Sequence, residues 1–286
     1  MSRRHPLVTC MVRAAMKAAR SLLRDFGEVE HLQVSKKGPA DFVSHADRAA
    51  ERILQEELGR MRPHFAFLLE EEGERPPPAG GKPTGRWIVD PLDGTTNFLH
   101  AVPHFAISIA AEEKGRVQAA VVYDPVRDEL FWAQRGGGAF LNDQRLRVSA
   151  RQKLEQALIA TGIPFAGHGE HERFLAELAG IMPRVAGIRR FGSAALDLAY
   201  VAAGRYDAFW EHGLHLWDIA AGALIVQEAG GLVSDHQGRP RAFETGEILA
   251  SNSHLHRPML RLLRLTHKRI AAGVAGPQPQ AEESQA

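Results

Sequence analysis

Cysteine is nearly absent from this chain of 286 residues, in which Cys10 is the only one. A single cysteine excludes an internal disulfide and a metal site built from several thiolates, and it fits a reducing cytoplasm. An excess of charge is missing as well, because 35 Lys and Arg face 34 Asp and Glu for a net charge of +1. A dedicated nucleic-acid binder usually has a basic excess, so this balance argues against that class.

Long uninterrupted apolar stretches are also missing. The stretch Leu7–Leu23 is rich in Ala, Val and Leu, but Arg13, Lys17 and Arg20 interrupt it, so we expect neither a secretory signal nor a membrane span. Its apolar residues recur three and four positions apart, which predicts an amphipathic helix. The composition, 44% hydrophobic and 24% charged, is that of an ordinary globular protein.

The remaining periodicities predict a mixture of helices and strands. Ser44–Leu58 has the pattern of an amphipathic helix with Asp47 in its first turn, and Gly73–Pro83 is too rich in Gly and Pro for a helix or a strand. We expect an antiparallel meander in the first half and alternating elements after Arg151. The predicted strands are Phe65–Leu69, Trp87–Val89, Phe105–Ala111, Val117–Tyr123, Glu129–Ala133, Leu158–Thr161, Ala208–Trp210 and Leu232–Ser234, and the later helices are His171–Ile181, Ala194–Ala203, Ile219–Glu228 and His254–Ile270.

These elements divide into two closely packed halves and a tail. We predict an N-terminal α+β half at 1–150 that holds the antiparallel sheet and the main metal motif, and a C-terminal α/β half at 151–270 that completes the site. Residues 271–286 are polar, rich in Pro, Gln, Glu and Ser, and without an apolar period, which predicts disorder.

The chemistry is concentrated in the segment Trp87–Asn97. An apolar strand delivers Asp90 and Asp93 at its carboxyl end, and Gly94–Thr96 follows with backbone N–H groups where a short helix can begin. Carboxylate oxygens suit Mg²⁺, and a helix start attracts phosphate, so the segment predicts metal-assisted phosphate chemistry. The alternative is a capped turn with a solvated Asp pair. The three-residue spacing, with Pro91 inside it, does not match phosphatases that use the first Asp of Asp-x-Asp-Gly-Thr as a nucleophile.

Four acidic blocks resemble the inositol monophosphatase family in order and spacing. They are Asp41–Asp47, which resembles Asp-Leu-Val-Thr-x-x-Asp; Phe67–Glu71, which resembles Gly-Glu-Glu; Trp87–Asn97, which resembles Asp-Pro-x-Asp-Gly-Thr; and Leu216–Gly222, which resembles Trp-Asp-x-Ala. The resemblance covers residues 5 to 265 and implies a mixed α+β and α/β fold, the layered αβαβα sandwich of the inositol monophosphatase and fructose-1,6-bisphosphatase type. Leu69 and Glu72 depart from the pattern, since the family usually has Gly before the metal-binding Glu and Gly or Ser after the pair.

The resemblance also implies roles for individual residues. Thr95, hydrogen-bonded toward Asp47, would help to position and deprotonate the attacking water, with Glu70 beside them. Two to three Mg²⁺ ions, with Mn²⁺ as the alternative, would have as ligands Glu70, Asp90, the carbonyl of Leu92, Asp93 and Asp218. The implied substrate contacts are Asp93, Gly94, Thr95, Gly192, Ser193, Ala194, Glu211 and Asp218.

Other interpretations of some of these residues stay open. Glu71 is the alternative metal ligand to Glu70, and Asp47 could instead be an acid that interacts with the dipole at the start of its helix. Glu211 could be a charge at a strand end, and Ser193 is better interpreted as a packed small residue than as a nucleophile.

The histidines offer a weaker signal for a metal. The spacing His212-Gly213-Leu214-His215 has no cysteine partners and no second pair, so it is weak evidence for zinc.

The implied activity is that of a magnesium-dependent phosphomonoesterase. It would hydrolyse inositol 1-phosphate to inositol and phosphate by direct attack of a metal-activated water, as a cytoplasmic homodimer that acts on small phosphorylated polyols and does not bind a membrane. Histidinol phosphate, 3′-phosphoadenosine 5′-phosphate and fructose 1,6-bisphosphate are alternative substrates. A nucleotide would need an aromatic or basic platform, which the sequence does not visibly supply near Glu211.

A role of another class would be non-catalytic. Some bacterial members of the family associate with RNA polymerase and antitermination factors, and the basic residues near both ends of the chain would suit such an association. Solvated helix faces are the other explanation of these basic residues.

Overall fold

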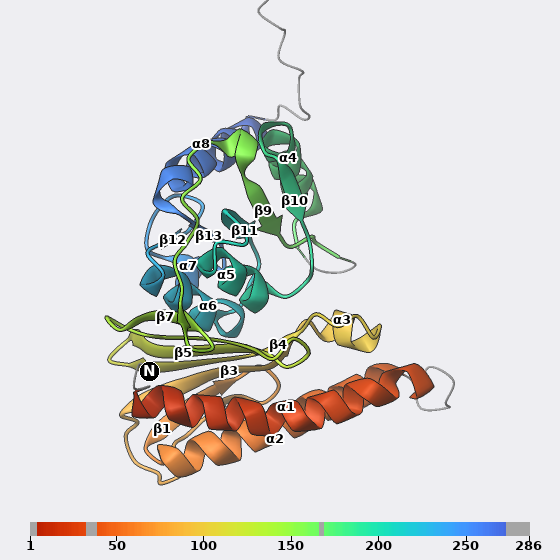
Figure 1. The fold of residues 1–286 in the computed structure, drawn as a ribbon, viewed down its shortest axis with the longest axis vertical. Coiled ribbons are helices and arrows are strands. Elements are labelled where there is room, and N and C mark those ends of the chain that lie inside the picture. The colour runs from red at the N-terminus through yellow and green to blue at the C-terminus, as the bar shows by residue number, and fades with distance from the viewer. Residues whose placement is uncertain (1–4, 33–38, 166–168, 273–286) are drawn as a thin grey trace, which may run out of the picture.

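The first two layers of the fold are a pair of long helices and a large sheet (Figure 1). The computed structural model describes residues 5–32, 39–165 and 169–272. Helices α1 (Pro6–Leu32) and α2 (Pro39–Met61) cover one face of an eight-stranded sheet with the order β2-β1-β3-β4-β5-β6-β7-β8. The strands are β1 (Phe65–Leu69), β2 (Gly73–Arg75), β3 (Gly85–Asp93), β4 (Ala106–Glu113), β5 (Arg116–Asp124), β6 (Glu129–Gln134), β7 (Gly138–Leu141) and β8 (Gln144–Arg145).

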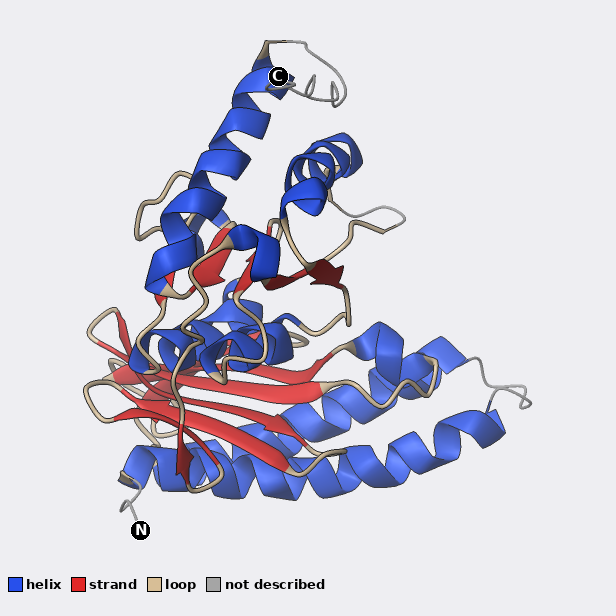
Figure 2. Cartoon of the chain, turned by 45° about the horizontal axis from the view of Figure 1, so that its top comes forward, coloured by secondary structure: helices blue, strands red, loops and turns tan. Residues whose placement is uncertain are grey.

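The next three layers are a helix pair, a smaller sheet and an outer helix pair. Helices α5 (Ala194–Ala202) and α6 (Leu216–Glu228) lie between the two sheets, and α4 (His171–Ile181) and α8 (Ser253–Ala271) cover the far side (Figure 2). The second sheet has the order β10-β9-β11-β13-β12. Its strands are β9 (Leu158–Thr161), β10 (Gly187–Arg189), β11 (Ala208–Glu211), β12 (Leu232–Ser234) and β13 (Ile248–Ser251), and the short elements are α3 (Thr95–Leu99), α7 (Ala242–Thr245) and the 3₁₀ helices η1 (Leu154–Gln156) and η2 (Met182–Arg184). The predicted αβαβα sandwich is confirmed.

Both faces of the large sheet are buried, which explains the continuous apolar texture of its strands. In β3, Trp87 and Val89 pack toward α1 and α2, whereas Ile88 between them packs toward α5 and α6. Successive side chains of a strand point to opposite faces, so a strand covered on both sides is apolar at nearly every position. The core therefore consists of one cluster beneath the large sheet, one between the sheets and one under α4 and α8.

Helices α5 and α6 fit between the sheets because they have apolar residues on all faces and many small side chains. Every residue of α5 is buried, as expected for a helix covered on all sides. At Gly222 of α6 a Cβ atom would lie 2.5 Å from Cβ of Leu198, so only glycine allows the two helices to approach this closely.

Two predictions about the N-terminal half are wrong. Residues Gly73–Arg75 are not part of the loop but form β2, which pairs antiparallel with β1; Gly73 adopts a left-handed φ of 71° at the turn. Helix α2 begins at Pro39, a residue well suited to a first turn, so Asp47 is its ninth residue and cannot act on the helix start. The dipole role considered for Asp47 is therefore excluded.

The other predicted elements are confirmed, most of them with small shifts of their ends, although α1 continues to Leu32 and not only to the predicted Leu23. The predicted meander is confirmed for β3 to β6 and continues into β7 and β8, whereas β1 lies parallel to β3. The prediction missed β7, β8, β10 and β13. Residues 273–286, most of the predicted tail, lie outside the described residues. Among the helices described, none is both long enough and apolar enough to cross a membrane.

Candidate metal and phosphate site

The acidic segment lies at an irregular end of β3. The pairing of β3 with β4 shifts register between Asp90 and Asp93. In a regular strand, side chains three residues apart point to opposite faces, but an irregularity of this kind redirects them. As a result, Asp90 and Asp93 line the same cleft, which has a volume of about 410 Å³. Asp90 is buried, and its Oδ1 accepts a hydrogen bond from the backbone N–H of Leu92 at 2.9 Å.

Two further carboxylates reach the cleft from distant parts of the chain. Glu70 directly follows β1, the parallel neighbour of β3, and its N–H donates to the carbonyl of Val89 at 3.2 Å. Asp218 lies in the first turn of α6, where its Oδ2 accepts from the N–H of His215 at 2.7 Å. The structure therefore brings together Glu70, Asp90, Asp93 and Asp218, which we call the carboxylate cluster.

Burial and mutual repulsion raise the pKa of every member of the carboxylate cluster. Burial raises the pKa of Glu70, Asp93 and Asp218 to about 7 each, and the neighbouring carboxylates add to the effect. The pKa of Asp90, the most enclosed member, is raised well above its ordinary range by burial and by the charge of Glu70. Crowded carboxylates disfavour ionisation unless a cation compensates them.

The donor set fits a hard divalent cation. All four members of the carboxylate cluster supply oxygen, the ligand type that Mg²⁺ and Mn²⁺ prefer. Within the described part of the chain, the buried Oε2 of Glu70 has no hydrogen-bond partner, so it is free to coordinate. Glu71, the alternative to Glu70, is exposed, and its carboxylate lies 3.2 Å from Nε of Arg48.

Thr95 is bonded differently from the expectation. Its hydroxyl donates to the carbonyl of Leu92 at 3.1 Å and not to Asp47. Asp47 is buried on α2, and its Oδ1 has no partner among the described residues. Burial, together with the charge of Glu70, raises the pKa of Asp47 to about 9. Thr95, Leu92 and Gly94 line the cleft, whereas Asp47 is not among the lining residues.

Asp93 connects the large sheet to the loop before α5. Its Oδ2 accepts from the hydroxyl of Ser193 at 2.6 Å and from the N–H of Ala195 at 2.7 Å. The same hydroxyl accepts from the N–H of Leu196 at 3.3 Å and caps α5. Ser193 is thus held on both sides, in agreement with a packed residue and not a nucleophile. Gly192, Ser193 and Ala194 all line the cleft, where they were expected.

Glu211 lies at the end of β11 and lines the same cleft as the carboxylate cluster. Its carboxylate lies directly over Gly162, where an added Cβ would be 1.8 Å from Oε1. Burial raises the pKa of Glu211 to about 8, and Asp93 and Asp218 add to the effect. Glu211 is therefore part of the cleft, in addition to being the last residue of its strand.

Two cleft residues were missed. Asp197 is buried in α5, and its Oδ1 has no partner among the described residues. A lone Asp in the apolar stretch of α5 was the available signal. Arg190 also lines the cleft, so the expectation that no basic group lies near Glu211 is wrong.

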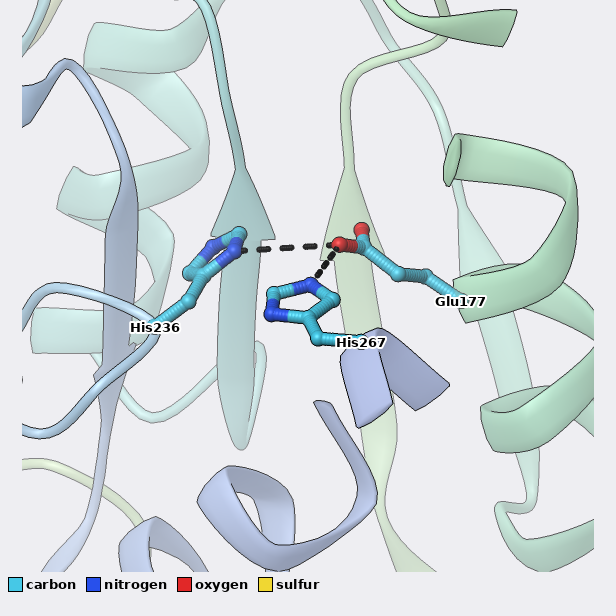
Figure 3. Close-up of side chains that lie close together, drawn as sticks. All are labelled: Glu177, His236 and His267. Carbon is cyan, nitrogen blue, oxygen red and sulfur yellow. Dashed lines mark hydrogen bonds and ion pairs between the residues drawn. The ribbon is translucent and has the colours of Figure 1, made fainter. Parts of the chain in front are cut away.

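The fold brings two histidines and a glutamate together from segments that are far apart in the sequence. Atoms of Glu177, His236 and His267 that could ligate a metal lie within 4.8 Å of one another (Figure 3). Arg173 lies among them, with Nη2 3.1 Å from Nδ1 of His236 and Nε donating to Glu177 at 3.0 Å. Since a guanidinium engages two of the three would-be ligands, we interpret this group as a buried ion-pair network, completed by Trp210 Nε1, which donates to Glu177 at 3.1 Å.

The predicted histidine pair takes no part in that group. His212 and His215 line the cleft instead, and His215 stacks on Trp217 with ring centroids 4.6 Å apart.

Comparisons with known proteins agree with this geometry. A family model described as the inositol monophosphatase family matches residues 3–271. An inositol-1-monophosphatase of Rhizobium meliloti is 56% identical over 91% of this chain and 97% of its own length. A protein named Nus factor SuhB of Pseudomonas aeruginosa is 48% identical over 91% of this chain and 96% of its own. The crystal structure of extragenic suppressor protein suhB from Bartonella henselae is similar with a TM-score of 0.82 and 55% identity, and the match covers 91% of this chain and 99% of that one.

Proposed function

We propose that this chain, which belongs to the inositol monophosphatase family and is therefore a phosphatase, hydrolyses inositol 1-phosphate with Mg²⁺ as its metal. The observation that supports this most is that four carboxylates with raised pKa values line one cleft, beside the small residues that follow Asp93. Such a cleft accepts a phosphate dianion only together with cations, because the carboxylates alone would repel it.

The carboxylate cluster and the carbonyl of Leu92 would hold the ions, which when bound lower the pKa of coordinated water and neutralise phosphate charge. The hydroxyl of Thr95 donates its hydrogen bond to the carbonyl of Leu92. Its oxygen is therefore available to accept a hydrogen bond from the attacking water. Backbone groups of Gly94 and Thr95 would hold the phosphate. The hydroxyl of Ser193 donates to Asp93 and accepts from Leu196, which supports a structural role, so hydrolysis would use water and no phosphoenzyme.

The polyol part of the substrate would meet the part of the cleft that holds Glu211. Glu211 would accept hydrogen bonds from its hydroxyls, and Gly192–Ala194 lines the same cleft. Small phosphorylated polyols are accordingly the substrate class we propose, with the homodimer and the cytoplasm as the expected state and location of the enzyme.

A phosphate-release assay tests the proposal. The purified chain is incubated with inositol 1-phosphate, histidinol phosphate, fructose 1,6-bisphosphate or 3′-phosphoadenosine 5′-phosphate, with Mg²⁺, with Mn²⁺ or with EDTA. We expect the highest kcat/KM for inositol 1-phosphate with Mg²⁺, and no activity with EDTA. Hydrolysis that persists in EDTA, or a clear preference for another ester, would refute the corresponding part.

A second candidate function rests on the relatives named Nus factor SuhB. We propose that the chain also associates with the transcription machinery, independently of hydrolysis. A pull-down with RNA polymerase should then give the same yield for the wild type and for an inactive Asp93→Asn variant. Loss of binding in that variant, or no binding by the wild type, would contradict an independent role.

A further inference from the structure

One permanent cation lies in the cleft among its acidic residues. Among the described residues that line the cleft, Arg190 is the only Lys or Arg, and it directly follows β10. It forms no hydrogen bond or ion pair with the described residues, although Glu211 and Asp197 are close enough for its charge to act on their ionisation. Arg190 is exposed at the cleft, and a guanidinium there that makes no bond to the described residues is suited to bind substrate.

The loop that holds Arg190 is anchored to the catalytic half of the cleft. The side-chain amide of Asn97 donates to the carbonyl of Phe191 at 2.7 Å, and Gly192 adopts a φ of 85° that few other residues tolerate. A Cβ at Gly192 would lie 2.8 Å from Nη1 of Arg190, so the guanidinium packs against this glycine. In the residues that follow Gly192, the hydroxyl of Ser193 and the N–H of Ala195 donate to Asp93. The position of Arg190 is therefore tied to that of the carboxylate cluster.

The chemistry around Arg190 is complementary to hydroxyl groups. A guanidinium only donates hydrogen bonds, and a carboxyl group accepts them through its oxygens whether or not it is ionised. Glu211 and Asp197 supply carboxyl oxygens close enough for the charge of Arg190 to act on them, and Oδ1 of Asp197 is buried without a partner among the described residues. A hydroxyl both donates and accepts, so neighbouring hydroxyls of a polyol can satisfy the arginine and the carboxylates at once. A phosphate ester without hydroxyls leaves both unpaired.

We propose that Arg190 is a specificity-determining residue, which donates hydrogen bonds to hydroxyl oxygens of the polyol while Glu211 and Asp197 accept from its hydroxyl protons. This inference rests on the proposed function and extends it, because it assigns the preference for polyol phosphates to a side chain outside the carboxylate cluster.

The test compares Arg190→Met with Arg189→Met. Arg189 is the matched control: it is the preceding residue, is exposed, donates to the carbonyl of Ile188 and does not line the cleft. Both variants keep an apolar stem of similar length. For each, kcat and KM are measured with Mg²⁺ on inositol 1-phosphate, on p-nitrophenyl phosphate, which has no hydroxyls, and on 3′-phosphoadenosine 5′-phosphate.

We expect Arg190→Met to lower kcat/KM for inositol 1-phosphate about 10- to 100-fold, as for the loss of hydrogen bonds to a charged group, and to lower that for p-nitrophenyl phosphate less than about twofold. Arg189→Met should leave both values unchanged. Thermal unfolding of each variant verifies that it is folded.

Three results would overturn the inference. They are an equal loss on both esters, no loss on inositol 1-phosphate, and a larger loss on 3′-phosphoadenosine 5′-phosphate, which would assign Arg190 to a second phosphate. The proposed function fails separately, when the wild type releases no phosphate from inositol 1-phosphate. If the wild type hydrolyses p-nitrophenyl phosphate but no polyol phosphate, both fail.

Discussion

Asp93→Asn separates the charge of this residue from its hydrogen bonds. Oδ2 of Asp93 accepts from Ser193 and Ala195, and an asparagine carbonyl oxygen can accept the same two bonds. Its amide group has no charge and donates, so it is a poor ligand for a divalent cation. We therefore expect the variant to keep the contact between the large sheet and α5 and to lose metal binding at this position.

The size of the effect on stability follows from the pKa. Burial, with the charge of Asp218, raises the pKa of Asp93 from its ordinary 3.8 to about 7. An acid whose pKa is raised on folding destabilises the fold above the folded pKa, and this cost disappears as the pH falls below the unfolded pKa. The shift of about 3 units sets an upper bound of about 4 kcal/mol at 1.36 kcal/mol per unit. Because neighbouring carboxylates share the cost, we expect about 1–2 kcal/mol.

The assay is thermal unfolding at several pH values, combined with phosphate release. Without metal at pH 8, Asp93→Asn should unfold about 2–5 °C above the wild type, and the difference should vanish near pH 4. Mg²⁺ should raise the unfolding temperature of the wild type much more than that of the variant. Activity on inositol 1-phosphate should fall at least about 100-fold.

The control is Asp93→Ala, which removes the charge and both hydrogen bonds. It should unfold below Asp93→Asn, since the N–H of Ala195 and the hydroxyl of Ser193 lose their acceptor. Full activity in Asp93→Asn would refute the catalytic assignment. Equal unfolding temperatures of the two variants would refute the structural role of the bonds.

Three further predictions concern the metal, a glycine and the buried network. Since three members of the carboxylate cluster have a pKa of about 7, metal affinity measured by isothermal titration should rise from pH 5 to pH 8 and then level off; a flat profile would contradict the coupling. Gly162→Ala should lower kcat/KM about tenfold or more, because its Cβ would overlap the carboxylate of Glu211, whereas the control Gly27→Ala, with open space around its Cβ, should leave activity unchanged. Glu177→Ala should cost about 3–5 kcal/mol in urea unfolding, because His267 and Trp210 lose their buried acceptor, although Arg173 keeps its bond to Glu247; a cost below about 1 kcal/mol would refute the ion-pair interpretation.

Local sequence patterns predicted most of the helices and strands. They failed where tertiary contacts determine whether a segment forms a helix or a strand. The strand Gly73–Arg75 was missed because three residues with a glycine have little strand propensity, and only the pairing with β1 stabilises them. The true start of α2 was missed because the segment before Ser44 shows no clear periodicity. Conversely, His171–Ile181 was predicted with its observed bounds, since its apolar residues follow a helical period.

The chemistry of the site was partly visible in the sequence. The segment from Asp90 to Thr95 predicts metal and phosphate chemistry without further information, because oxygen donors and small turn residues are adjacent there. Glu70 and Asp218 were recognised only through the family resemblance, since nothing local shows that they meet Asp90. Asp197 and Arg190 were missed, because the sequence alone does not show what lines a cleft.

The sequence by itself therefore determined the class of fold and the class of chemistry, both of which depend on periodicity and on neighbours along the chain. The tertiary structure decided how the site works. Because of the register shift in β3, the side chains of Asp90 and Asp93 line one cleft. The hydrogen bond between Asp93 and Ser193 joins residues 100 positions apart in the sequence. The raised pKa values arise from burial and from carboxylates that are distant in sequence, because desolvation and Coulomb forces depend on distance in space.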